Sequence, residues 1–213
     1  WNKTGGPANW SSSYWSAGEP DDTDDAYITN NGTAQITSTG EAADHLYLGS
    51  SYGWSGTVDM TSGSLLVDWD IQIGTWGTGT FTQSGGTVSH YWAGGDMVLG
   101  YNNSGVGSYY LTNGTLGTHT LTVGRDGTGT FRVGNGTVHV GYGGYNDNLI
   151  IGDADESQAY SGTGTFRVSG TGVLNIVDSS AEIYVGVDDG TYHGTGRFEW
   201  FTPTATGIVQ GGG

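Results

Sequence analysis

Residues 71–88 read Ile71-Gln72-Ile73-Gly74, Gly79-Thr80-Phe81 and Gly86-Thr87-Val88, with short polar turns between these segments. The first segment, two apolar residues around a variable one and then a glycine, occurs six times in the chain. Its glycines lie 24 to 34 residues apart, at Gly49, Gly74, Gly100, Gly124, Gly152 and Gly186. A period in this range is typical of a chain that stacks one short unit.

The other two segments recur in the same order. The aromatic position of the second is filled by Phe81, Tyr109, Phe131, Phe166 and Phe198, and the apolar position of the third by Leu65, Val88, Leu116, Val138 and Leu174. Period-2 alternation bounded by Gly, Ser, Asn and Asp predicts strands. Three strands per unit predict an all-β, right-handed parallel β-helix with three faces and about seven coils. The aromatic residues should then stack in one internal ladder, about 4.8 Å apart.

The first part of the chain lacks the repeat and is rich in aromatic residues, among them Trp1, Trp10 and Trp15. A solenoid has to cover its first coil, so we expect residues 1–35 to form an N-terminal cap and residues 36–213 one continuous solenoid. The chain begins at Trp1 and contains no signal peptide or transmembrane run. This pattern favours a processed secreted protein, at the cell surface or outside the cell, or an excised fragment.

Two stretches resemble a known family. Residues 18–28, Gly-Glu-Pro-Asp-Asp-Thr-Asp-Asp-Ala-Tyr-Ile, and residues 79–88, Gly-Thr-Phe-Thr-Gln-Ser-Gly-Gly-Thr-Val, look like the autotransporter-associated β-strand-repeat proteins. Similar repeats occur in secreted bacterial surface proteins of the PEP-CTERM type. The resemblance implies a β-helical, passenger-like fold in an extracellular adhesive or matrix protein, and it implies no particular activity.

The net charge of −16 argues against nucleic acid and anionic membranes as partners. The acidic residues gather in turns, where oxygen ligands for Ca²⁺ are commonly found. The two candidate sites are Asp21, Asp22, Asp24 and Asp25, and Asp153, Asp155 and Glu156. Neither run matches a known calcium loop, so the alternative is solvated acidic turns and a fold that requires no cofactor.

Catalysis has little support in the sequence, and we expect no enzyme. The five histidines show no metal-ligand spacing, cysteine is absent, and no Gly-x-Ser-x-Gly occurs. Some parallel β-helices are polysaccharide lyases or hydrolases, which use paired carboxylates or basic residues on one face. Asp68 and Asp70, on either side of Trp69, are the one pair that fits this alternative.

Exposed aromatic residues in the connections suggest a second alternative, a glycan-binding adhesin module. The candidates are Trp54, Trp76, Trp92, Tyr101, Tyr160 and Tyr192. Aromatic platforms beside Asp and Asn hold sugars by stacking and hydrogen bonds, but the same residues are enriched at protein interfaces.

The end of the chain contains no polar cap, and a bare last coil would expose Trp200, Ile208 and Val209. Such an edge is a template for another chain, here the Trp1, Trp10 and Trp15 cap of a second copy. We therefore expect a head-to-tail homopolymer, and as function a structural extracellular protein of a surface fibre, layer or matrix.

Overall fold

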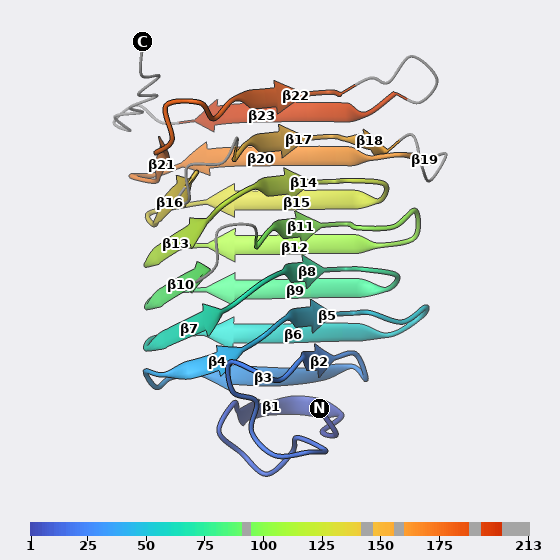
Figure 1. The fold of residues 1–213 in the computed structure, drawn as a ribbon, viewed down its shortest axis with the longest axis vertical. Helices are drawn as coiled ribbons and strands as arrows, with labels where there is room; N and C mark the ends of the chain where they lie inside the picture. Colours follow the sequence, from blue (N-terminus) through green and yellow to red (C-terminus); the bar gives the residue numbers. More distant parts are fainter. Residues whose placement is uncertain (91–94, 142–146, 156–159, 188–192, 202–213) are drawn as a thin grey trace.

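The computed structural model describes residues 1–90, 95–141, 147–155, 160–187 and 193–201, which form strands and turns without a helix. The strands make three parallel sheets that wind around one axis, as Figure 1 shows. The predicted three-faced parallel β-helix is therefore confirmed. Each of the six coils between Ala26 and Ile176 contributes one strand to each sheet, in the order first, second and third sheet, and the last described strands add one each to the first and second sheets.

The first sheet contains β2 (Ala26–Ile28), β5 (Leu46–Leu48), β8 (Ile71–Ile73), β11 (Met97–Leu99), β14 (Leu121–Val123), β17 (Leu149–Ile151) and β22 (Ile183–Val185). The second contains β1 (Gly5–Asn9), β3 (Gly32–Ile36), β6 (Ser55–Met60), β9 (Thr78–Gln83), β12 (Val106–Leu111), β15 (Thr128–Val133), β20 (Thr163–Ser169) and β23 (Thr195–Phe201). The third contains β4 (Glu41–Ala43), β7 (Ser64–Val67), β10 (Thr87–His90), β13 (Thr115–Thr118), β16 (Thr137–Val140) and β21 (Val173–Ile176). The short strands β18 (Ala154–Asp155) and β19 (Tyr160–Ser161) form a separate antiparallel pair.

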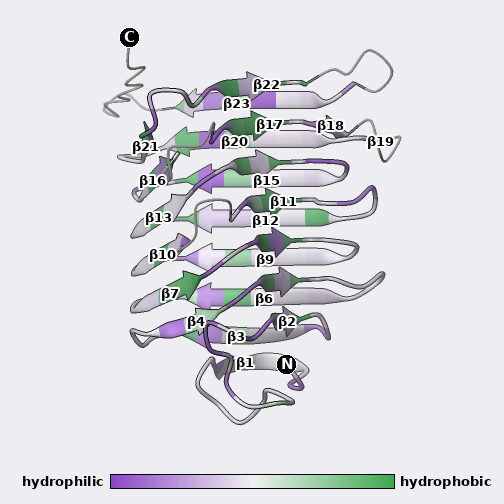
Figure 2. Cartoon of the chain, viewed as in Figure 1, coloured by the Kyte–Doolittle hydropathy of each residue, from purple (hydrophilic) through white to green (hydrophobic). Residues whose placement is uncertain are grey.

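The core is a set of columns in which equivalent residues of successive coils lie on one another. Hydrophobic residues recur at the same places on successive strands, with polar residues between them (Figure 2). The predicted aromatic ladder is confirmed: the rings of Phe81, Tyr109, Phe131, Phe166 and Phe198 stack at 4.8, 4.9, 5.1 and 5.6 Å. The spacing follows from the separation of neighbouring strands in a sheet, since the five residues pair in register.

The glycines of the motif are required where the first strand turns into the second. Gly74 has a φ of 74°, and a Cβ added there would lie 2.2 Å from the carbonyl oxygen of Val106 on the next coil. A Cβ on Gly79, which starts the second strand, would lie 2.3 Å from the amide nitrogen of Gly74. The repeat therefore keeps glycine because both the dihedral angle and the close approach of two backbones demand it.

The N-terminal segment folds beneath the first coil (Figure 1). Trp10 is fully buried, Trp1 and Trp15 are nearly so, and the Trp15 Nε1 group donates a 2.6 Å hydrogen bond to the carbonyl oxygen of Trp10. The three indoles belong to the hydrophobic core and continue it into the N-terminal cap. Within the stretch that the sequence assigns to the cap, β2 pairs in parallel with β5, so regular coils begin at Ala26.

Candidate functional site

An aromatic groove lies at the corner between the first and second sheets. The β5–β6 connection carries Tyr52 and Trp54, and the β8–β9 connection carries Trp76 on the next coil. The Tyr52 and Trp76 rings lie 4.9 Å apart at an angle of 42°. The groove has a volume of about 260 Å³ and is lined by Asn31, Tyr52, Gly53, Trp54, Ser55, Trp76, Gly77, Thr78 and Ser104.

The polar residues of this aromatic groove are held in place by hydrogen bonds. Asn31 Oδ1 accepts from the backbone and hydroxyl groups of Ser55, both at 2.9 Å, and the Ser104 hydroxyl donates to the carbonyl oxygen of Trp76 at 2.6 Å. Tyr52 is 63% exposed and Trp54 is 47% exposed. Flat, exposed rings beside fixed oxygen atoms can stack on the apolar face of a sugar and bond its hydroxyls.

Two of the other predicted glycan-binding residues, Tyr101 and Tyr160, do not line this groove. Tyr101 is half-buried on the next coil, where the Arg125 guanidinium lies 4.8 Å from the centre of its ring. Tyr160 lies exposed on β19, next to the turn that follows the first sheet. Trp92 and Tyr192 lie outside the described residues.

The predicted calcium ligands in the cap largely bond to their own neighbours. Asp21 accepts hydrogen bonds from the backbone and hydroxyl of Thr23 at 2.9 and 2.7 Å, and Asp25 accepts one from the Tyr27 hydroxyl at 3.0 Å. Burial first, and then this contact with Asp25, raise the pKa of Tyr27 to about 12. Asp22 and Asp24 are exposed in the same turn.

At the other candidate site, Asp153 is half-buried and its backbone bonds to Gly124 and Gly162. Asp155 belongs to β18, and Glu156 lies outside the described residues. The described part of the chain therefore holds no complete set of ligands at this candidate site.

The structure instead brings Asp25 together with Asp44 and His45, whose potential ligand atoms all lie within 4.8 Å of one another. One imidazole and two carboxylates differ from the six to eight oxygens that Ca²⁺ takes. Sequence reasoning missed this cluster because Asp25 lies one coil before the adjacent residues Asp44 and His45. The available signal was that Asp25 and His45 each directly precede an apolar-x-apolar strand.

At the corner between the third and first sheets, polar side chains accept hydrogen bonds from the backbone of the next coil. Asp70 Oδ1 accepts from the backbone of Asp96 at 3.1 Å, and Asn148 Oδ1 accepts from the backbone of Glu182 at 2.8 Å. Burial, followed by the charges of Asp70 and Asp147, raises the pKa of Asp96 to about 6. Asp70, one of the two carboxylates considered for catalysis, is thus part of a backbone-bonding row.

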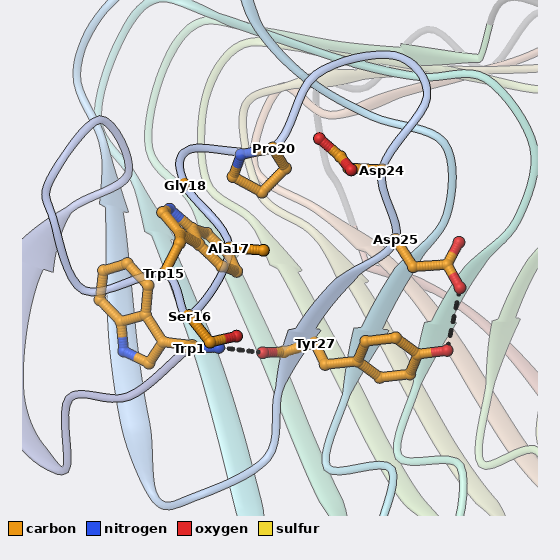
Figure 3. Close-up of a pocket in the computed structure, with 9 residues that line it drawn as sticks. All are labelled: Trp1, Trp15, Ser16, Ala17, Gly18, Pro20, Asp24, Asp25 and Tyr27. Atoms are coloured by element: carbon orange, nitrogen blue, oxygen red, sulfur yellow. Dashed lines mark hydrogen bonds between the residues drawn. The ribbon is translucent and has the colours of Figure 1, made fainter.

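A small pocket lies in the cap, with a volume of about 100 Å³ (Figure 3). Trp1 and Trp15 form one wall, and Asp24, Asp25 and Tyr27 lie on the opposite side. Its size suits ordered water, so it adds no ligand site of its own.

The residues predicted for self-association lie in two different environments. Trp1, Trp10 and Trp15 are buried within the cap, whereas Trp200 is partly buried against the end of the core. Ile208 and Val209 lie outside the described residues. The clearest exposed core position is Val185, which is 48% exposed although its counterpart one coil earlier, Ile151, is fully buried.

Comparisons with known proteins identify no relative: no family model, curated protein or solved structure matches the chain. Among the described residues, no helix is long and apolar enough to cross a membrane. The fold places the chain in the class of three-sheet parallel β-solenoids.

Proposed function

We propose that the protein is a non-catalytic, extracellular structural solenoid whose copies associate end to end. The observation that carries the proposal is the exposure of Val185, a residue of an inward-facing column that is buried in the preceding coils. Phe198 and Trp200, on the neighbouring strand β23, are also only partly buried. Apolar surface of this kind gains free energy when another molecule covers it.

The geometry suggests how a second copy would fit. Strands β1 and β23 occupy the two ends of the same sheet, each with one edge that no described strand pairs. Parallel pairing of β23 with β1 of the next copy would continue the second sheet across the contact. Such a head-to-tail interface does not close on itself, so it produces a fibre.

The test is the size of the particles formed by the wild-type chain and two aspartate variants, measured by sedimentation and negative-stain electron microscopy. Val185→Asp should prevent association, because it places a charge in the contact. Val106→Asp is the matched control, since Val106 is 41% exposed on a central coil, and it should associate like the wild type. A wild-type chain that stays monomeric at high concentration, or a Val185→Asp chain that still associates, would refute the proposal.

A second candidate function, glycan binding, is favoured by the aromatic groove at Tyr52, Trp54 and Trp76. A glycan array should reveal a ligand, and Trp54→Ala should weaken its binding by about ten-fold or more, the loss expected for one stacking platform of ~1.4 kcal/mol or more. Trp69→Ala is the control, because Trp69 is 43% exposed at a different corner. Equal loss in both variants, or no ligand on the array, would exclude this function.

Polysaccharide cleavage is the alternative function against which the proposal can be tested. Incubation with acidic and neutral polysaccharides should release no new reducing ends. The reason is that Asp70 Oδ1 already accepts a hydrogen bond from the backbone of Asp96.

A further inference from the structure

A buried carboxyl group lies where the cap meets the first coil. Glu41 begins β4, the last strand of the third sheet at its N-terminal end, and it pairs with Leu65. It therefore occupies the inward-facing column that Leu65, Val88, Leu116, Val138 and Leu174 fill on later coils. Only 5% of Glu41 is exposed.

The partner of this buried group is a second carboxyl group. The Glu19 carboxyl group, which the cap carries next to the buried Pro20, lies within hydrogen-bonding reach of Glu41. Two carboxyl groups can bond to each other only when one of them holds a proton, since an ionised carboxylate has no donor. The pair can therefore form this bond only while one of the two groups is protonated.

The strand beside Glu41 supplies no charge to balance this pair. Strand β7, against which β4 packs, consists of Ser64, Leu65, Leu66 and Val67 and has no titratable side chain. The one basic residue of the cap, Lys3, lies over the ring of Tyr14. Burial first, and then the hydrogen bond and charge of Glu19, raise the pKa of Glu41 to about 7.

We propose that the Glu19–Glu41 pair is a proton-dependent latch that holds the cap on the first coil in acidic surroundings and releases it in alkaline ones. When Glu41 loses its proton, a charge is buried beside Leu65 and faces the Glu19 carboxylate. Both effects disfavour the closed cap. Release uncovers the indoles of Trp10 and Trp15, which are buried while the cap is closed.

The direction of the pH effect follows from proton linkage. Glu41 has a pKa of about 7 with the cap closed and returns towards the ordinary value of 4.5 when the cap opens, so the closed form binds more protons. The stabilisation is complete below about pH 4.5 and is lost as the pH rises through 7. The ratio of open to closed cap should rise about ten-fold or more between pH 5 and pH 8.

Hydrogen exchange of the full chain, measured by mass spectrometry at pH 5 and pH 8, tests the latch. Protection factors corrected for intrinsic exchange should fall at pH 8 in peptides from residues 1–25. Peptides from residues 121–140, in the middle of the solenoid, serve as the internal reference and should not change. Equal protection of residues 1–25 at the two pH values would overturn the proposal.

Variants separate this pair from the other acidic groups of the cap. Glu41→Gln keeps a hydrogen-bond donor for Glu19 at every pH, so its cap should stay protected at pH 8. Asp22→Asn removes an exposed acidic residue of the cap and should keep the wild-type response.

A third variant covers the case in which Glu41→Gln does not fold. Glu19→Gln lies on the surface, and it should move the wild-type transition to lower pH because the like charge is removed. A Glu41→Gln chain with the wild-type response, or an unchanged midpoint in Glu19→Gln, would each refute the latch. Because the proposed contact between copies involves β1, the exchange is compared at two protein concentrations, and the latch predicts the same pH response at both.

Discussion

The Tyr109 hydroxyl donates a 2.6 Å hydrogen bond to Gln83 Oε1 in the interior of the solenoid, where both residues are fully buried. Gln83 Nε2 in turn donates to the carbonyl oxygens of Gly86 and Thr115, each at 3.0 Å. Burial raises the pKa of Tyr109 well above its ordinary value, so the hydroxyl remains a donor. The only tyrosine of the aromatic ladder thus has its polar atom satisfied by a glutamine in the neighbouring column.

This relationship predicts non-additive stability changes. Tyr109→Phe leaves Gln83 Oε1 without that donor, and Gln83→Leu leaves the tyrosine hydroxyl unpaired, so each should cost about 1–3 kcal/mol of unfolding free energy. The double variant should cost at least about 0.5 kcal/mol less than the sum, because the mismatch is removed with the pair. Urea unfolding of the four proteins measures the coupling, and strictly additive costs would contradict it.

Substitution of two glycines with the same φ should separate the cost of backbone strain from the cost of steric crowding. Gly53 and Gly74 both have a φ of 74°, but a Cβ added at Gly53 meets nothing within 4 Å. Gly53→Ala should therefore cost about 1 kcal/mol, the penalty of a left-handed alanine. Gly74→Ala adds a collision with the Val106 carbonyl and should cost about 2 kcal/mol more, through forced backbone movement. Thermal and urea unfolding compare the two, and equal costs would show that crowding is unimportant.

The repeating part of the fold could be predicted from the sequence, because each position of the motif has the same environment in successive coils. Phe131 and Phe166 could be placed in one column before the structure was known, although the copies are 35 residues apart. The start of the first coil was missed, since Ala26-Tyr27-Ile28 is followed by Thr29 in place of the motif glycine.

The candidate site was predicted less completely, because contacts between coils depend on the exact register and on loop geometry. Trp54 and Trp76 were predicted as exposed corner residues, but the direct contact of Trp76 with Tyr52 was not. The burial of Glu41 also escaped prediction, since β4 carries it where later coils carry an apolar residue. The signal for the burial of Glu41 was a polar residue at a position that is apolar in later coils.

Chelation should have no effect on thermal stability. The carboxylates of Asp21 and Asp25 already accept hydrogen bonds from Thr23 and Tyr27, so the cap turn has internal partners for them. Melting curves with and without EDTA should show the same midpoint. A fall of several degrees that added Ca²⁺ reverses would contradict this expectation and indicate a bound ion.

His90 is expected to make the fold sensitive to acid. Its Nδ1 atom lies 3.1 Å from the Thr118 hydroxyl, and its ring stacks on His119 with the planes 4° apart. Burial first, and then the charge of His119, lower the pKa of His90 from 6.5 to about 3. The folded chain therefore binds fewer protons here than the unfolded chain, which favours the fold above pH 6.5 and weakens it as the pH falls towards 3.

Replacing this imidazole by a neutral amide should remove that part of the acid response. Between pH 7 and pH 4, the unfolding free energy of His90→Gln should fall by about 1 kcal/mol or more less than that of the wild type, because the variant has no imidazole at this position to protonate. The comparison cancels the opposite contribution of Glu41, which both proteins retain. His193→Gln is the control, since His193 is exposed, and it should follow the wild-type curve. Urea unfolding at each pH provides the free energies; parallel curves for His90→Gln and the wild type would show that His90 is protonated equally in the folded and unfolded chain.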